Sequence, residues 1–391
     1  MASSRFPTFR FWIRAVFLSI PLSVAAQLGP DSLRFAIIAD PQYADKTSTT
    51  DRCYRNTIAK MNTAITFLNS KAPAFLLILG DYVDGYTAAD SAITVRDINA
   101  LNVEVSKFQG PVYQVMGNHD EASLNKSEWL QYTYGVIKKN YYSFDVGPIH
   151  FIVLDGNYTP NGKDYGRIDP WVWTDTQIPA EQKAWLIANL DSAGQKPTII
   201  AIHQNIHDQT DYSLDNSTEI RQILQTHGNV THVLQGHRHE GAYAQVSGIH
   251  YVTQQAMVNC PASVTGTGNN YALVVIKDSA MYIDGYGGTP DRTLIAPGLR
   301  KAAWTTSLQE SPQTSFAWNP IELSDGYLRF NMGGPHEIFV HDLNGQLISS
   351  RKGDGATAYA LTDLNAANPG TVYVFTARTT RGVFSKKLIR P

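Results

Sequence analysis

The length, composition and charge of this 391-residue chain exclude several classes of protein. Hydrophobic residues make up 43% of the sequence and charged residues 17%, which excludes an intrinsically disordered chain. The formal net charge of -2 supplies no basic field, so nucleic acid and anionic membrane surfaces are not expected partners. The length exceeds what one hydrophobic core usually supports, and we expect about two domains.

Residues 1–26 differ from everything that follows. Three arginines precede the apolar stretch AVFLSIPLSVAA, and Val24 and Ala26 fit the small-residue rule for cleavage before Gln27. This pattern predicts a signal peptide and an exported protein, either secreted or held at the cell surface. The stretch is shorter than the roughly 20 apolar residues of a spanning helix, so we expect no stable membrane span, and a single uncleaved anchor is the alternative.

From residue 33 to residue 287 short apolar runs alternate with helical patterns. The runs are too short for buried helices and rich in β-branched or aromatic residues, so they predict core strands. They read FAIIAD, AFLLILGD, PVYQVMGNHD, HFIVLDGN, TIIAIHQ and THVLQGHRH. Apolar residues at helical spacing predict helices over 58–68, 98–108 and 185–190, and Asn216 with Glu219 predicts a capping box that opens a fourth. The alternation favours a layered α/β domain over 27–296.

The sequence changes character after residue 296. Residues 297–318 hold scattered Ser, Thr, Gln and Pro, which is typical of a linker. Residues 319–391 alternate apolar and polar residues between Gly, Asn and Asp turns, which predicts a small all-β sandwich module. Its DLNGQLI, GTVYVF and GVFSKKLI segments resemble type IX secretion sorting domains, which would make the secretion machinery a partner. A generic β-sandwich is the alternative.

Side chains of metal-ligand type follow five of the six predicted strands. In open α/β sheets the carboxyl ends of strands converge on one crevice, so these side chains are expected to lie together. Taken singly, each has a plainer interpretation, since Asp after Gly is common in turns and a lone strand-end histidine is usually structural. The residues are Asp40, Gln42, Asp81, Asp84, Asn118, His119, Asp120, His203, His237 and His239.

The order of these groups resembles the calcineurin-like metallophosphoesterases, whose pattern is D-x-H, GDxxD, GNHD, a strand-end His and GHxH. The resemblance implies a layered αββα sandwich and a site for two divalent metal ions. Asp81 would bridge the ions. Asp40, Gln42 and His239 would complete one ligand set, and Asn118, His203 and His237 the other.

The chemistry of the residues agrees with this resemblance. Two ions about 3.5 to 4 Å apart can hold a hydroxide beside a phosphorus and neutralise the oxygens around it. The donors are oxygen and nitrogen without thiolate, which favours Mn, Fe or Zn. Since Asn118 takes the ligand position, His119 is expected to stabilise charge at the phosphoryl group or to protonate the leaving oxygen. Asp84 and Asp120 are expected to orient ligands or His119, with turn or capping duty as the alternative.

A closer resemblance, to the manganese-dependent ADP-ribose/CDP-alcohol diphosphatases, rests on four stretches. They are IADPQYAD, DRCYRNT, LGDYVDGY and GYGGTPDRT. The resemblance implies that Gln42 is an ordinary ligand of this subfamily, that the metal is manganese, and that the substrate is a small nucleotide diphosphate conjugate. The alternative for Gln42 is that its amide points away and only binds a loop.

Some features depart from that pattern or stay open. The segment IHQNIHDQTD lacks the usual prolines and adds His207, and residues 155–180 are another place where specificity could differ. Arg55 and Arg292 could bind phosphate, because a guanidinium matches its geometry, or could form structural salt bridges. Cys53 and Cys260 are expected to be two separate buried residues, with a disulfide between them as the alternative.

Two other functions remain as alternatives to the diphosphatase. One is a phosphomonoesterase or phosphodiesterase of different specificity, and the other is a surface protein whose fold only binds metal or ligand. A purple acid phosphatase is disfavoured, because that group has tyrosine where Asp84 stands. Loss of a ligand would favour the non-catalytic alternative, and no ligand is lost.

Overall fold

The computed structural model describes residues 32–87, 89–167, 172–261 and 266–301, together with seven strands between 321 and 389. The predicted signal peptide lies outside these residues, as do residues 302–318 of the predicted linker. In the part of the chain that is described, no helix has the length and apolar character needed to cross a membrane.

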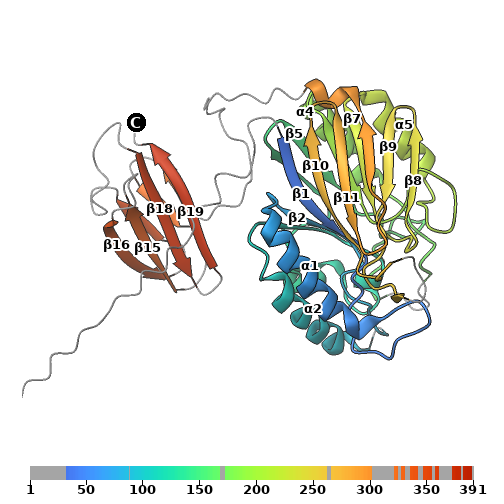
Figure 1. Ribbon diagram of the computed structural model, residues 1–391, viewed down its shortest axis with the longest axis horizontal. Coiled ribbons are helices and arrows are strands. Elements are labelled where there is room, and N and C mark those ends of the chain that lie inside the picture. The colour runs from blue at the N-terminus through green and yellow to red at the C-terminus, as the bar shows by residue number, and fades with distance from the viewer. Residues whose placement is uncertain are drawn as a thin grey trace, which may run out of the picture.

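The first sheet has six strands in the order β12-β11-β10-β1-β2-β3 (Figure 1). The strands β1, β2 and β3 run parallel, and β10 pairs antiparallel with β1. The helices α1 (Thr57–Lys71) and α2 (Ser91–Val105) make the crossovers between the parallel strands. The strand bounds are β1 Ser32–Ile38, β2 Leu76–Leu79, β3 Val112–Val115, β10 Tyr271–Lys277, β11 Ala280–Tyr286 and β12 Arg292–Ile295.

The second sheet also has six strands, in the order β4-β5-β6-β7-β9-β8. Its central strands β5, β6, β7 and β9 are parallel, and α4 (Ala180–Ala193) and α5 (Ser217–His227) connect β5 to β6 and β6 to β7. The strand bounds are β4 Tyr142–Val146, β5 Ile149–Val153, β6 Thr198–Ile202, β7 Val230–Gln235, β8 Ala242–Val246 and β9 Ile249–Thr253.

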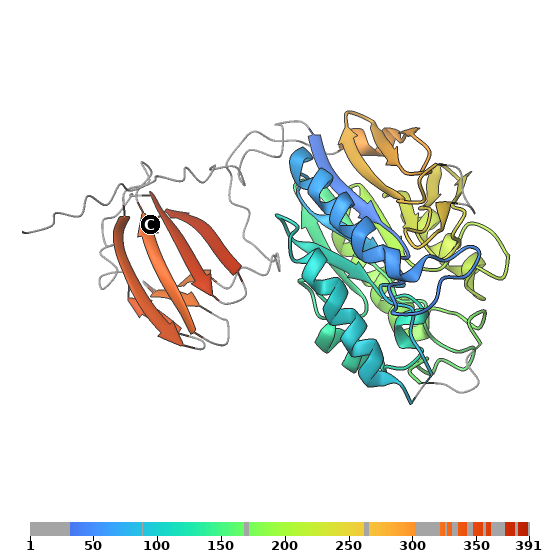
Figure 2. The same cartoon turned by 60° about the horizontal axis from the view of Figure 1, so that its bottom comes forward.

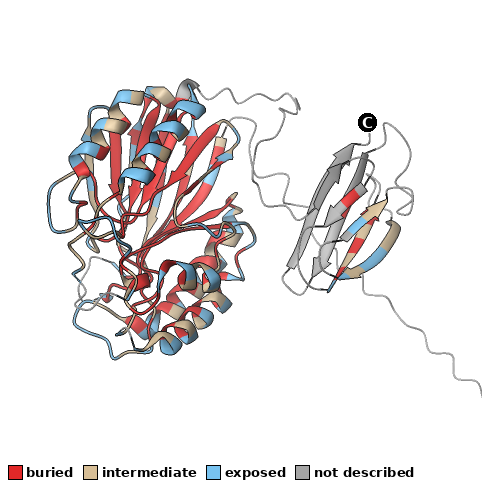
Figure 3. Ribbon diagram, turned by 180° about the vertical axis from the view of Figure 1, so that it is seen from behind, coloured by how far each residue is buried: buried red, intermediate tan, exposed pale blue. Residues whose placement is uncertain are grey.

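Alternating side chains on the strands build the layers. In β1, Phe35 and Ile37 enter the core between the two sheets, while Ala36 and Ile38 pack with residues of α1 and α2. A third core joins the outer face of the second sheet to α4 and α5. Figure 3 shows the buried strands between helices whose outer faces are exposed, and Figure 2 shows α1 and α2 side by side. The predicted αββα sandwich is confirmed.

One detail of the sequence prediction is wrong. The side chain of Asn216 does not cap α5, because its Oδ1 accepts a hydrogen bond from the backbone N–H of Ile178 instead. The capping box that does form is at Asn125 and Glu128, at the start of α3 (Lys126–Tyr132).

The first residues of the predicted linker are helical. Residues Pro297–Lys301 form the 3-10 helix η4, and the fully buried Leu299 joins the core between the sheets.

The C-terminal region is all β, as predicted. A three-stranded sheet has the order β13-β14-β17, and a four-stranded sheet the order β16-β15-β18-β19, and neighbouring strands pair antiparallel in both. The bounds are β13 Ile321–Ser324, β14 Tyr327–Phe330, β15 Pro335–His341, β16 Leu347–Asp354, β17 Thr357–Ala360, β18 Val372–Thr379 and β19 Gly382–Ile389.

Candidate metal centre

The predicted ligands lie on loops that follow the carboxyl ends of strands in both sheets. Asp40 and Gln42 follow β1, Asp81 follows β2, and Asn118 follows β3 in the first sheet, while His203 follows β6 and both His237 and His239 follow β7 in the second. The backbone N–H of His237 donates to Asp40 Oδ1 at 3.0 Å, so the two sheets meet at this point. Parallel strands explain the convergence, since their carboxyl ends share one edge.

The backbone of this edge is strained where the ligands sit. Asp40, Gln42, Asp81 and His237 have φ angles of 47°, 39°, 48° and 69°, in the left-handed region that residues with a Cβ avoid. Each such residue costs about 1 to 3 kcal/mol, and strain of this kind is concentrated at functional sites. Gly117 allows a further close approach, because a Cβ there would lie 2.1 Å from the backbone nitrogen of Asp81.

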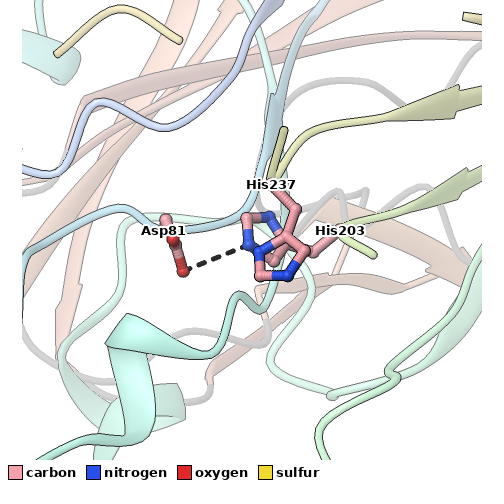
Figure 4. A group of neighbouring side chains, drawn as sticks. All are labelled: Asp81, His203 and His237. Carbon is pink, nitrogen blue, oxygen red and sulfur yellow. Dashed lines mark ion pairs between the residues drawn. The ribbon is translucent and has the colours of Figure 1, made fainter. Parts of the chain in front are cut away.

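Asp81, His203 and His237 form one group that could hold a metal ion (Figure 4). Their ligand atoms lie within 4.8 Å of one another, and His203 Nε2 is 3.3 Å from Asp81 Oδ1. His203 Nδ1 donates to the carbonyl of Leu79, which fixes the ring with Nε2 facing the site. The Oδ1 atom of Asn118 lies 3.0 Å from the same Nε2, so all four predicted members of this ligand set come together.

Asp40, Asp81 and His239 form the second group. The Nε2 of Gln42 donates to Asp81 Oδ2 at 2.7 Å, and its Oε1 is buried without a hydrogen-bond partner. The amide of Gln42 therefore points into the site, and the alternative that it only binds a loop is wrong. Asp81 is shared by both groups, as expected of a bridging carboxylate.

These residues fit two divalent cations. Buried polar atoms normally have hydrogen-bond partners, yet Gln42 Oε1 and His237 Nε2, which can both ligate a metal, have none among the described residues. Burial, and to a smaller extent the neighbouring Asp81, raise the pKa of Asp40 to about 7, because a fully buried carboxylate lacks sufficient positive charge around it. Divalent ions would supply that positive charge, and the unpaired ligand atoms would coordinate them. The oxygen and nitrogen donors suit Mn, Fe or Zn.

His119 stands beside the ligands, and Asp84 orients it. The Nδ1 atom of His119 lies 2.7 Å from Asp84 Oδ1, while Lys46 Nζ donates to the other oxygen of Asp84 at 2.6 Å. Burial lowers the pKa of His119, but Asp81 and Asp84 outweigh burial and the net shift is upward. Its Nε2 is 4.0 Å from Asp81 Oδ2, so the ring can present a proton at the edge of the centre.

Asp120 has a different place. Its two carboxylate oxygens accept from the backbone N–H groups of Val83 and Gly117, at 3.1 and 2.9 Å. Asp120 thus ties the loop after β2 to the loop after β3. Burial, followed by repulsion from Asp81, raises its pKa to about 7.

Among the described residues, the three predicted substrate residues form no hydrogen bond or ion pair with a predicted metal ligand. Arg55 is more than half exposed and forms an ion pair with Asp45, which matches its structural alternative. His207 lies against Gln235 and Asp208. Arg292 lies over the ring of Tyr243 and lines a small cavity together with Glu240 and Gln254.

Sequence reasoning missed Arg52. Its positive charge acts on both Asp81 and Asp84, and after burial it is the next cause that lowers the pKa of His239, to about 3. The DRCYRNT stretch contains two arginines, and the one nearer the centre is Arg52, not Arg55. The signal that could have found it is its position directly before Cys53.

The prediction that the two cysteines are separate is wrong, because Cys53 and Cys260 form a disulfide with a Cα–Cα distance of 5.0 Å. Segment 256–260 reaches from this bond to the metal ligands. The backbone N–H of Val258 donates to the carbonyl of Asp40, and that of Ala256 to the carbonyl of His239. We call residues 256–260 the anchor segment. It holds two ligand loops on one side and the Arg52 loop on the other.

Comparisons with known proteins agree with this geometry. Residues 33–241 match the family of calcineurin-like phosphoesterases. The chain is 25% identical over 323 residues to the manganese-dependent ADP-ribose/CDP-alcohol diphosphatase of Xenopus laevis, covering 66% of this chain and 89% of that protein. The Arabidopsis thaliana protein of the same name is 26% identical over 271 residues, covering 58% and 86%.

Solved structures show the same fold. A dimetal phosphatase from Danio rerio superposes with a TM-score of 0.58 at 18% identity, covering 68% of this chain and 99% of that one. The family match spans more than half of the 391 residues and includes every ligand from Asp40 to His239. This chain belongs to the calcineurin-like phosphoesterase family and is a metal-dependent phosphoester hydrolase.

Proposed function

We propose that this enzyme hydrolyses the pyrophosphate bond of nucleotide conjugates such as ADP-ribose or CDP-alcohols, with manganese as its metal. One observation carries the proposal. The amide of Gln42, within the stretch IADPQYAD, hydrogen-bonds Asp81, which both candidate ligand groups share. The relatives named manganese-dependent ADP-ribose/CDP-alcohol diphosphatases, from animals and plants, support the same substrate class.

The residues of the chain divide the work of hydrolysis. Two divalent ions, when bound, supply the Lewis acidity that phosphoester cleavage needs. Asp81 has its Oδ1 beside His203 and its Oδ2 beside Gln42, so it contacts a residue of each ligand group. His119 is held by Asp84, and the neighbouring carboxylates raise its pKa, which favours the form that can donate a proton to a phosphoryl oxygen or to the leaving oxygen. The positive charge of Arg52 nearby favours an anionic substrate.

A substrate panel tests the proposal. Purified protein with Mn is assayed against ADP-ribose, CDP-choline, a cyclic nucleotide and an aryl phosphate. We expect kcat/KM to be highest for one of the two diphosphate conjugates. Preference for the aryl phosphate or the cyclic nucleotide would replace the diphosphatase with a phosphomonoesterase or phosphodiesterase.

We also propose that the protein is exported. The disulfide between Cys53 and Cys260 supports this location, because such bonds persist in oxidising compartments. Mass spectrometry of the mature protein from its host would test it, with an N-terminus at Gln27 as the expected result. Docking of the C-terminal β region to a secretion machinery stays a prediction.

A further inference from the structure

Two aromatic side chains lie directly beside a metal ligand. The ring centroids of Trp173 and Tyr212 are 5.5 and 5.6 Å from that of His237, both in edge-on contact. The two rings are also 5.7 Å from each other, so the three rings form a closed triangle. His237 is buried, whereas Trp173 and Tyr212 are each partly exposed. We call the ligand group that contains His203 and His237 the His237 side of the centre. The pair of aromatic rings therefore lies between this side and solvent.

Hydrogen bonds hold the two loops that carry these rings. The backbone N–H of Asn205 donates to the carbonyl of Tyr212 at 2.9 Å, two residues after the ligand His203. The loop of Trp173 is joined to the loop of Tyr212, because the N–H of Asp215 donates to the carbonyl of Thr176 at 2.7 Å. The rings are thus placed by the backbone and need little ordering when a ligand binds, which lowers the cost of binding.

The surroundings of the rings suit a ligand with a flat group, and the positive charge of Arg238 beside them is balanced by two carboxylates. The guanidinium of Arg238 is 5.7 Å from the centroid of Tyr212, with Glu240 2.9 Å and Asp208 3.9 Å from its nitrogens. The phosphates of a substrate belong at the metal ligands, and the group attached to the phosphate must leave the centre past its rim. On the His237 side that rim is aromatic, and a nucleobase has a π-face that stacks on such rings.

We propose that Trp173 and Tyr212 form the stacking face for the nucleobase of the substrate. This inference rests on the proposed function for its substrate class, a nucleotide diphosphate conjugate. The pair selects a nucleotide over a phosphate or diphosphate that lacks a base. Base stacking on an aromatic residue contributes affinity corresponding to roughly 5- to 150-fold.

A pair of hydrolysis-resistant probes tests the proposal by binding. The dissociation constants of α,β-methylene-ADP and of methylenediphosphonate are measured by calorimetry on the Mn-loaded full chain. The dissociation constant of methylenediphosphonate divided by that of α,β-methylene-ADP reports how much affinity the nucleoside contributes. We expect Trp173→Leu and Tyr212→Leu each to lower this ratio by about 5-fold or more. Tyr212→Phe keeps the ring and should keep the ratio. The metal content of each variant is measured alongside.

Trp185→Leu is the matched control, since Trp185 is partly exposed on α4 and contacts Tyr141. It should leave the ratio unchanged. An unchanged ratio in both ring variants overturns the stacking face even if ADP-ribose is hydrolysed. A lowered ratio in a protein that does not hydrolyse diphosphates supports the stacking face and sinks the proposed function, so the two failures are distinguishable.

Discussion

The two sides of the metal centre are held in different ways. On the Gln42 side, the anchor segment binds the carbonyls of Asp40 and His239 and is itself fixed by a disulfide. The buried Lys60 adds hydrogen bonds from its Nζ to the carbonyls of Met257 and Asn259. On the His237 side, no disulfide is present among the described residues, and aromatic rings form the rim.

This difference suggests a division of labour. The Gln42 side combines Asp40, Asp81 and His239 with the neutral amide of Gln42, on a backbone that the disulfide restrains. The His237 side combines two imidazoles with the amide of Asn118, and two aromatic rings lie beside it. The disulfide therefore restrains one side of the centre, whereas the aromatic rings on the other side lie on loops, which differ most readily between relatives.

Asp81→Asn should have the largest effect, since Asp81 belongs to both sides. The substitution removes the only carboxylate common to the two ligand groups, so metal binding should weaken at both positions. The loss of activity should exceed the roughly 10²- to 10⁴-fold expected of a positioned acid or base. Metal analysis after dialysis measures the effect. Retention of two ions per chain would contradict a shared ligand.

His119→Ala should leave metal binding unchanged on both sides of the centre. We expect both ions to stay bound and kcat to fall by about 10² to 10⁴, the usual contribution of a positioned acid or base. Asp84→Asn should lower kcat less, because it disturbs only the orientation of His119. Loss of metal from His119→Ala would show that its role is wrongly assigned.

Removing the disulfide should affect the two sides of the metal centre unequally. Replacing Cys53 and Cys260 together with Ser should lower the free energy of unfolding by about 2 to 5 kcal/mol, because the bond closes a long loop in the unfolded chain. Urea denaturation measures the change, and dithiothreitol should shift the wild type but not the double variant. We also expect weaker binding of one ion only. Equal weakening of both ions would remove the distinction between the sides.

Gln42→His should change the metal preference of the Gln42 side. Imidazole binds Zn or Fe more strongly than an amide oxygen does, so Zn affinity should rise and activation by added Mn should fall. The change should reach at least the scale of 10- to 100-fold that outer ligand partners control. Calorimetric titration with Zn and Mn measures it. Identical preferences in both proteins would remove Gln42 from the ligand set.

The ligands were predictable from sequence for a physical reason. Each follows a short apolar run directly, so parallel strands in a layered fold must bring them to one edge. The disulfide was not predictable, because 207 residues separate its cysteines and only the path of the anchor segment joins them.

The aromatic rim was missed for a similar reason. Trp173 and Tyr212 lie on irregular loops without periodicity, and their contact depends on hydrogen bonds between the two loops. Local patterns also misled at Asn216, where a backbone group of another segment competes for the capping side chain.

A histidine away from the centre should give the smallest effect and set a baseline for the others. His232 is fully buried in β7 and stacks on His250 at 5.1 Å. Burial, and then the neighbouring His250, lower its pKa to about 3. The unfolded chain, in which a histidine titrates near 6.5, therefore binds more protons than the folded chain between these two values. The contribution of His232 to the free energy of unfolding is therefore fully present above about pH 6.5 and is lost as the pH falls below that value.

The slope should be up to about 1.4 kcal/mol per pH unit, and His232→Leu should remove it. Urea denaturation of metal-free wild type and variant at pH 7, 6 and 5 measures the difference between the two slopes. Titrating groups of the metal centre are common to both proteins, so they cancel in this difference. Parallel curves for the two proteins would show that His232 does not contribute to acid sensitivity, and that acid acts through the buried ligands on the two sides of the centre.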